Sequence, residues 1–255
     1  MSEISIIPIG SGSTGNCIYI EIVGFAFLVD LGIGYRKVNE ALICNSRDIS
    51  DINAVFVTHG HNDHIKAYQA MCNHLNCKVY ANETVMYNIR NTKTERVILK
   101  EDTITSIVEG FRVKMFRVPH DYVRTCAYTF EYKGKKVAYL TDCGRMNNKI
   151  RNELYGSDMV IIESNHDYEM LKHGPYPKFL QDRILSEYGH LSNDECADVI
   201  VDLYEKGTRN FILAHLSLKN NTPELAYKTC LEKLCKDDAF IYVCLSESKD
   251  LLVFD

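Results

Sequence analysis

Residues 58–64 read THGHNDH, and this stretch places four metal-type side chains within six positions: His59, His61, Asp63 and His64. The chain has only nine histidines among 255 residues, so an H-x-H-x-D-H pattern would arise by chance in roughly one such chain in a thousand. The run AVFVT (54–58) is apolar and β-branched, which predicts a buried strand ending at the cluster. Imidazole nitrogens and carboxylate oxygens together suit zinc, manganese or iron and not calcium. The alternative, a solvated histidine-rich turn, leaves the residues at the other strand ends unexplained.

Further polar residues recur where apolar strands are predicted to end. Those residues are Asp30 after FAFLV, His120 after FRVKMFRVP, Asp142 after KKVAYLT, Glu163 after MVII and His215 after FILA. Strand interiors hold their positions, and strand ends open into loops where ligands can converge. Charged residues also mark strand exits simply because strands surface there, and this explanation suffices for Asp30 or Glu163 alone. For the whole set we predict one rim of a β-scaffold that carries a metal site.

Helical patterns alternate with the predicted strands along the chain. We expect helices at 35–43, 64–75, 83–91, 193–207 and 222–236. The last two have polar caps, and the helix at 193–207 stops at a glycine. The clearest hairpin covers 125–142, with Lys133 and Gly134 at its turn. A loop is expected between the strand at 159–164 and the helix at 193–207.

Composition bounds the class of protein. With 46% hydrophobic residues and no evident linker, residues 1–255 are predicted to form one domain with a sizeable core. Ten cysteines without a CxxC pair, and no signal peptide, predict a reduced cytoplasmic protein. No run is long enough to cross a membrane. A net charge of −5 argues against a broad basic footprint on nucleic acid but allows a local patch.

One group of basic residues could form such a patch near the site. The group comprises Lys133, Lys135, Lys136, Arg145, Lys149 and Arg151. A solvated hairpin is the more usual explanation for these charges.

THGHNDH resembles, without departure, the H-x-H-x-D-H motif of the metallo-β-lactamase-fold hydrolases. VPHD, LTDCG and LAHLS fit the later ligands of that superfamily. Five further motifs resemble its YycJ/WalJ branch, whose members are described as DNA exonucleases or uncharacterised metal-dependent hydrolases: GSGSTGN (10–16), ESNHD (163–167), GPYP (174–177), GHLSN (189–193) and LAHLSLKNN (213–221). The resemblance implies an α/β fold, a four-layer αββα sandwich of two mixed β-sheets flanked by helices, with the site at one edge.

The resemblance also implies two divalent transition-metal ions, zinc or manganese. One ion would take His59, His61 and His120, the other Asp63, His64 and His215, and Asp142 would bridge them. Asp30 resembles an aspartate that orients a ligand without binding metal. Such ions lower the pKa of bound water to about 7 and so provide a hydroxide nucleophile.

Glu163 and His190 resemble a proton-donating pair of the tRNase Z relatives in order and context. Glu163 could hold and charge His190, which would then protonate the leaving oxygen as a general acid. Alternatively, His190 only precedes a helix and helps to cap it through Ser192 or Asn193. Together with Asp63, the pair forms the catalytic set that the resemblance implies.

Small polar residues nearby are candidates for substrate binding: Ser11, Ser13, Asn16, Asn165, His166 and Asn220. GSGSTGN lacks the G-K-[ST] ending and precedes a strand, which disfavours a nucleotide P-loop. Its backbone amides could still approach a substrate, or it could be only a tight turn. His166 and Asp167 could instead bind a further metal or brace their loop.

The function that we predict is a phosphodiesterase or exonuclease acting on DNA ends. A small-molecule thioester, lactone or cyclic phosphodiester hydrolase is the second hypothesis, and a non-enzymatic metal-binding scaffold in a repair or signalling complex is the third. Only 72 residues separate Asp142 from His215, too few for the β-CASP insertion of related nucleases. Nucleic acid must then be bound by loops or by another subunit, and the second alternative would require a homo-oligomer.

Overall fold

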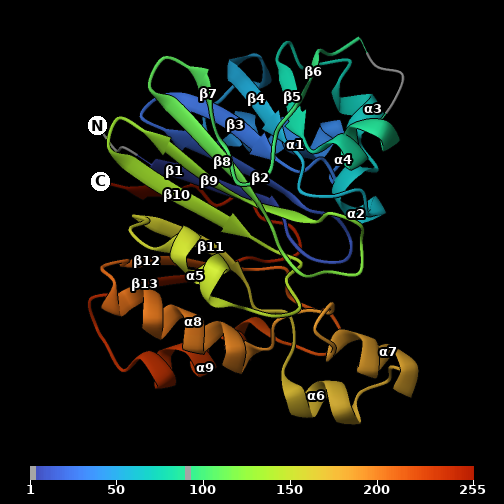
Figure 1. The fold of residues 1–255 in the computed structure, drawn as a ribbon, viewed down its shortest axis with the longest axis vertical. Coiled ribbons are helices and arrows are strands. Elements are labelled where there is room, and N and C mark those ends of the chain that lie inside the picture. The colour runs from blue at the N-terminus through green and yellow to red at the C-terminus, as the bar shows by residue number, and fades with distance from the viewer. Residues whose placement is uncertain (1–3, 90–92) are drawn as a thin grey trace.

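The computed structural model describes residues 4–89 and 93–255 as two mixed β-sheets packed face to face between layers of helices (Figure 1). The first sheet has the order β14-β1-β2-β3-β4-β5-β6. Its strands are β1 (Ile4–Gly10), β2 (Cys17–Ile22), β3 (Phe25–Val29), β4 (Ile52–Phe56), β5 (Lys78–Ala81), β6 (Arg96–Ile98) and β14 (Leu252–Phe254).

The second sheet has the order β13-β12-β11-β10-β9-β8-β7. Its strands are β7 (Ile104–Val108), β8 (Phe111–Arg117), β9 (Cys126–Tyr132), β10 (Lys135–Leu140), β11 (Met159–Glu163), β12 (Asn210–Ala214) and β13 (Phe240–Val243). Each sheet is antiparallel over three successive pairings and parallel over the next three. The change of direction falls at β3 in one sheet and at β10 in the other, and both strands lead into the site.

Helices cover the outer face of each sheet. They are α1 (Tyr35–Cys44), α2 (Asn62–Ile65), α3 (Tyr68–Met71), α4 (Glu83–Asn88), α5 (Asn148–Leu154), α6 (Tyr168–His173), α7 (Lys178–Ile184), α8 (Asn193–Glu205) and α9 (Pro223–Leu234). The first four lie on the side of the first sheet, whereas α5, α8 and α9 cover the second sheet. The predicted αββα sandwich is therefore confirmed.

An aromatic core fills the space between the sheets. Phe27 packs 5.4 Å from Phe56 and 4.5 Å from Phe130, measured between ring centroids, and all three side chains are fully buried. Helices on the outer faces bury the other sides of the strands, so β3 and β11 are buried throughout instead of alternating between buried and exposed residues. This packing on both faces holds the strand ends, and hence the residues that follow them, in place.

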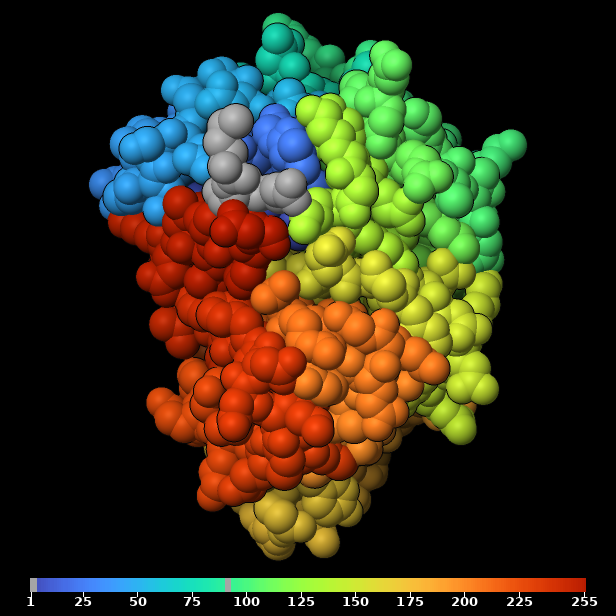
Figure 2. Space-filling model, turned by 90° about the vertical axis from the view of Figure 1, so that its left-hand side faces the viewer, coloured from blue at the N-terminus to red at the C-terminus, as the bar shows by residue number. Residues whose placement is uncertain are grey.

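The terminal segments lie together on one face. Figure 2 shows the C-terminal segment in red between the blue N-terminal part and the orange helix α8. β13 belongs to one sheet and β14 to the other, so this segment joins the two layers. All ten cysteines are free and most are buried. In the described part of the chain, no helix has the length and apolar character needed to cross a membrane.

Three predicted segments differ from the structure. The helix expected at 64–75 is broken into α2 and α3, because the Asp63 carbonyl accepts from Asn16 N and Ala67 N donates to Leu31 O. Those bonds replace the i→i−4 bond that a continuous helix needs. The loop expected before residue 193 contains α6 and α7, which are too short to show a clear helical period. The helix expected at 83–91 ends at Asn88, and residues 90 and 91 lie outside the described residues.

Candidate metal centre and active site

Strands of both sheets deliver the predicted residues to one edge of the sandwich. His59 and His61 follow β4, and His61 is the N-cap of α2, which carries Asp63 and His64. The other members leave the ends of strands in the second sheet: His120 after β8, Asp142 after β10, Glu163 at the end of β11 and His215 after β12. The structure thus brings together residues that are up to 156 positions apart in the sequence.

Three ring nitrogens form the first group at this edge. His61 Nδ1 lies 3.0 Å from His59 Nε2 and 3.4 Å from His120 Nε2. These separations are close to the ~3.3 Å edge of a tetrahedron whose metal–nitrogen bonds are ~2.0–2.1 Å. The group therefore has the spacing of three ligands around one ion.

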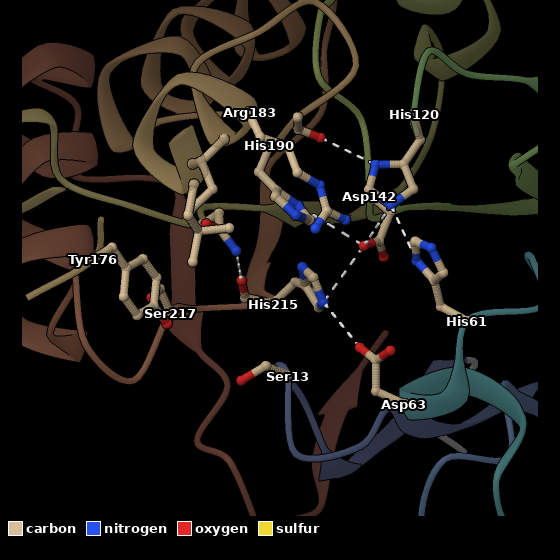
Figure 3. Close-up of a pocket in the computed structure, with 14 residues that line it drawn as sticks. Ser13, His61, Asp63, His120, Asp142, Tyr176, Arg183, His190, His215 and Ser217 are labelled. Atoms are coloured by element: carbon tan, nitrogen blue, oxygen red, sulfur yellow. Dashed lines mark hydrogen bonds and ion pairs between the residues drawn. The ribbon is translucent and has the colours of Figure 1, made fainter. Parts of the chain in front are cut away.

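The second group combines Asp63, His64 and His215. Asp63 Oδ2 lies 3.5 Å from His64 Nε2 and 3.8 Å from His215 Nε2. Asp142 lies between the two groups: its Oδ2 is 3.2 Å from His64 Nε2, and its Oδ1 is 3.6 Å from both His120 Nε2 and His215 Nε2. One buried carboxylate thus faces both sets of ligands (Figure 3).

Buried carboxylates orient the histidines of the second group. Asp30 Oδ2 is 2.7 Å from His64 Nδ1, and Glu163 Oε1 is 2.7 Å from His215 Nδ1. Both carboxylates are fully buried. Each therefore accepts a hydrogen bond from Nδ1–H and leaves Nε2 directed at the cluster, which is how carboxylates usually support metal-binding histidines. The role of Glu163 toward His215 is one that sequence reasoning missed.

The same Glu163 oxygen also lies 2.7 Å from His190 Nδ1. The Glu163–His190 pair predicted from the sequence is thus in contact. Helix α8 is capped independently of His190, because Ser192 and Glu195 form a complete capping box. His190 lines the cavity above the cluster, and its ring is half-buried there.

Three of these residues have left-handed backbone conformations. Asp30 has φ 63°, Asp142 φ 56° and His215 φ 58°. Non-glycine residues rarely adopt positive φ, and such strain concentrates at functional sites. In each case the turn comes directly after a buried strand and bends the side chain into the cluster. No sequence pattern reveals this feature.

The GSGSTGN loop braces the second group from below. Asn16 Oδ1 accepts from Gly12 N at 2.7 Å, and Asn16 Nδ2 is 3.2 Å from Asp63 Oδ2. Ser11 Oγ accepts from His215 N at 2.7 Å. Gly32 lies against both this loop and Asp63. A Cβ there would overlap the Asp63 carbonyl oxygen, so this position needs a glycine.

The remaining substrate-binding candidates divide by burial. Ser13 and Asn165 line the cavity, where contact with a substrate stays a prediction. His166 and Asn220 are buried, as are Ser11 and Asn16, and they lie behind the cavity wall. The His166 carbonyl accepts from Asn193 N at 2.8 Å, which ties its loop to the start of α8.

The electrostatics of the cluster favour bound cations. Burial lowers the pKa of His59, His61 and His120, which keeps these rings neutral and able to donate a lone pair. Burial would also lower the pKa of His215, but the charge of Asp142 and the neighbouring carboxylates of Asp63 and Glu163 outweigh it and raise the pKa to about 10.

The carboxylates of the cluster are held in their charged form. Burial would raise the pKa of Glu163, but the charge and hydrogen bond of His190, together with those of His215, lower it to about 2. Burial is similarly outweighed at Asp142, where His215 and His64 hold the pKa well below its usual range. Both carboxylates therefore stay negatively charged although they are buried.

The donor set fits divalent transition metals. Asp142 Oδ2 and His215 Nε2 are buried and have no hydrogen-bond partner among the described residues. Leaving such atoms unpaired is costly, and a cation between them would satisfy both. Nitrogen and carboxylate donors at this spacing suit zinc or manganese better than calcium, which prefers six or more oxygens.

A cavity of about 220 Å³ opens above the cluster. Its far wall comes from the segment around α7, through Tyr176, Leu180, Arg183 and Ile184. Figure 3 shows Tyr176 and Ser217 across the cavity from His61. The sequence does not reveal this wall, because α6 and α7 are too short to show a helical period and GPYP (174–177) is the one motif in the segment.

Arg183 connects this wall to the ligands. It forms an ion pair with Asp121, whose other oxygen lies 3.2 Å from His120 Nε2 and 3.6 Å from His61 Nε2. Arg183 is also the one lysine or arginine among the described residues that line the cavity. Asp121 follows His120 directly in VPHD, and this position is the only signal in the sequence that points to it.

The basic residues considered for a local patch do not form one beside the site, which favours the hairpin explanation. Lys133, Lys135 and Lys136 lie at the turn of the β9–β10 hairpin, and from Lys135 to Asp142 the strand runs for ~20 Å. The site is at the opposite end of β10. Arg151 pairs with Asp202 at 3.0 Å and the Lys136 Nζ donates to Glu153 O at 2.8 Å.

The other two members of the basic group also differ from each other. Lys149 pairs with Asp102 at 2.6 Å. Arg145 lines a cavity that adjoins the site, so it is the one residue of the basic group that lies near the cluster.

This fold and this cluster define a metal-dependent hydrolase. The family model described as "Beta-lactamase superfamily domain" matches residues 26–216, and the chain belongs to this family. The chain is 35% identical over 223 residues to the exodeoxyribonuclease YycJ of Bacillus anthracis, covering 86% of this chain and 84% of the relative. It is 32% identical over 236 residues to the exodeoxyribonuclease WalJ of Streptococcus pneumoniae, covering 90% of this chain and 88% of that protein.

Solved structures share the fold at low identity. The metallo-beta-lactamase fold protein YhfI from Bacillus subtilis superposes with a TM-score of 0.75 at 14% identity, over 99% of this chain and 100% of that one. The short form of human tRNase Z superposes with a TM-score of 0.64 at 17% identity, over 97% of this chain and 98% of that one. At such identities the likeness supports the architecture alone.

Proposed function

We propose that this chain, as a single domain of residues 1–255, is a nuclease that hydrolyses phosphodiester bonds at the ends of DNA. The single observation that carries the proposal is the contact between Glu163 and His190 at the wall of a cavity above the ligand cluster. A phosphodiester needs its leaving oxygen protonated, and thioester hydrolysis does not. The two relatives named as exodeoxyribonucleases support DNA as the substrate.

Two metal ions would be held by seven residues. The first group is His59, His61 and His120, the second is Asp63, His64 and His215, and Asp142 faces both. When bound, the ions would supply Lewis-acid activation of water and neutralise charge on the phosphate. Zinc and manganese are both compatible with this donor set.

The protein's own residues would orient the reaction. Asp30 and Glu163 hold the His64 and His215 rings through Nδ1, so their Nε2 atoms point at the cluster. Asp121 lies against the first group and holds Arg183 at the edge of the cavity. Arg183 is thereby placed to bind a non-bridging phosphate oxygen through the N–H donors that Asp121 does not occupy.

His190 would act on the leaving group. Its Nδ1 is occupied by Glu163, so its Nε2 is the nitrogen available to the cavity. A proton held there passes to the leaving oxygen as the phosphodiester bond breaks, and the Glu163 carboxylate stabilises the positive ring before transfer. Glu163 contacts both His190 and His215, so one buried carboxylate would couple the proton donor to the metal ligands.

The test is hydrolysis by protein loaded with zinc or manganese. Substrates should include end-labelled single-stranded DNA, duplex DNA and RNA, together with bis-p-nitrophenyl phosphate and a thioester. We expect release of mononucleotides from DNA, loss of this activity with a chelator, and its recovery when metal is restored. Asp142→Ala protein purified in parallel controls for contaminating nucleases. Thioester cleavage without release of nucleotides would overturn the proposal.

A further inference from the structure

A second cavity of about 490 Å³ adjoins the site on the other side of His120. Its wall includes two arginines, two tyrosines and one glutamate: Arg117, Arg145, Tyr122, Tyr188 and Glu187. His120 is the residue common to this groove and to the 220 Å³ cavity above the cluster. We refer to the second cavity as the flanking groove.

The two cavities share a rigid wall. Glu187 and Tyr188 line the flanking groove, whereas the next two residues, Gly189 and His190, line the cavity above the cluster. The Gly189 carbonyl lies 3.1 Å from His120 Nδ1. A Cβ at Gly144 would collide with Gly189 N, so this loop packs tightly on the turn that follows Asp142. A ligand that leaves the cluster past His120 therefore enters a preformed groove.

The groove's side chains match the two parts of a nucleotide. Arg117 is exposed at the end of β8 and has no carboxylate partner among the described residues, so its guanidinium is available to a phosphate. Arg145 already pairs with Glu187. Tyr188 is 58% exposed, which offers a ring face for a base. Tyr122 packs on His61 at 4.9 Å between ring centroids, so the groove wall continues to the ligands.

We propose that the flanking groove binds the part of a single DNA strand that continues beyond the scissile phosphate. The smaller cavity, closed by the segment around α7, then takes the terminal nucleotide. Base stacking on Tyr188 requires an open π face, which each base of a single strand can present and the stacked interior bases of a duplex cannot. This inference rests on the proposed function and specifies its substrate as single-stranded ends.

The experiment compares matched substitutions. Arg112 and Arg117 are both exposed on β8, but Arg112 lies ~16 Å away at the other end of the strand, where it pairs with Glu131. Arg117→Ala is therefore compared with Arg112→Ala, which removes the same charge outside the groove. Tyr188→Ala is compared with Tyr227→Ala, since Tyr227 is 41% exposed on α9.

Binding is measured by fluorescence anisotropy with a phosphorothioate oligodeoxynucleotide, which resists hydrolysis. We expect Arg117→Ala and Tyr188→Ala each to raise the Kd for the single strand by about tenfold, while the two controls stay near wild type. Arg117→Ala should also reduce the slope of log Kd against log salt by ~0.7. Hydrolysis of bis-p-nitrophenyl phosphate should fall far less than hydrolysis of DNA, because this small diester does not extend into the groove.

The outcomes separate this inference from the proposed function. If DNA is hydrolysed but the groove variants have the same Kd as their controls, the proposed role of the flanking groove is wrong and the nuclease proposal stands. Single-strand binding that depends on Arg117 and Tyr188, without any hydrolysis, supports the groove and overturns the nuclease proposal. Blunt duplex bound as tightly as the single strand, with the same sensitivity to Tyr188→Ala, overturns the assignment of a single strand.

Discussion

The floor of the site and its rim are held in different ways. The floor residues His59, His64 and Asp142 are buried, and they follow strands of the two sheets or sit on the helix after β4. The rim residues Arg145 and Arg183 lie on loops and a short helix, with more than half of each side chain exposed. This difference teaches that the chemistry is rigidly preorganised, whereas recognition of the substrate depends on side chains that can move.

The largest expected effect comes from removing the carboxylate shared by both ligand groups. Asp142→Ala should reduce hydrolysis of every substrate below detection, by ~10³-fold or more, because the several kcal/mol of charge stabilisation depends on both ions. Metal content should fall with it, as measured by elemental analysis, while circular dichroism stays native. A variant that keeps wild-type metal content and rate would remove Asp142 from the site.

His190→Ala should come next, with a fall of ~10²–10⁴-fold in the rate of DNA cleavage and unchanged metal content. The loss should shrink for bis-p-nitrophenyl phosphate, because nitrophenolate leaves without protonation. Single-turnover rates on both substrates measure the difference. Equal losses on the two substrates would mean that His190 has only a structural role.

Glu163→Gln sharpens the same comparison, because Glu163 contacts His215 as well as His190. It should lower both the rate and the affinity for metal, whereas His190→Ala lowers the rate alone. Metal titration followed by calorimetry separates the two effects. Unchanged metal affinity in Glu163→Gln would show that His215 needs no support from this carboxylate.

A smaller effect on activity is expected for Asp30→Asn, which weakens the hold on His64 without touching a substrate. Affinity for metal should fall by ~10–100-fold, and added metal should restore much of the rate. The free energy of unfolding should drop by about 3 kcal/mol, because a buried charge pair with His64 is broken. Chemical denaturation with and without metal measures both quantities.

The rim gives the smallest expected change. Arg183→Ala should raise KM for DNA by about three- to tenfold with a lesser change in kcat, since Arg183 contributes one charge-assisted contact to the phosphate. Lys178→Ala is the matched control, because Lys178 lies on the same helix and does not line the cavity. A KM in Arg183→Ala equal to that of the control would place the phosphate elsewhere.

The ligand cluster could be predicted because its signal is local. His59, His61, Asp63 and His64 fall in one short motif, and the later ligands follow strands that contain an apolar run. Placement at strand ends is visible in sequence, since a buried strand in a covered sheet has a continuous apolar pattern. The sandwich architecture followed from the same motifs through their resemblance to a superfamily.

The rim could not be predicted from the same signals. Tyr176 and Arg183 lie in a segment with two short helices, where no apolar period is long enough to be recognised. For the basic residues around Lys135, a patch near the site was the less usual explanation, and they lie at the end of β10 opposite to the site. Asp142 follows the opposite end of β10, so the turn of this hairpin lies away from the site.

By itself the sequence determined the residue types of the metal centre and the strands that carry them. Ligand motifs and apolar strand patterns each span only a few consecutive residues, so they can be recognised without the fold. Only the tertiary structure decided that Glu163 supports two histidines at once and that Asp121 joins His120 to Arg183. It also decided the left-handed turns at Asp30, Asp142 and His215. These features arise where strands of two sheets meet, and contacts between residues far apart in the chain exist only after both sheets have packed.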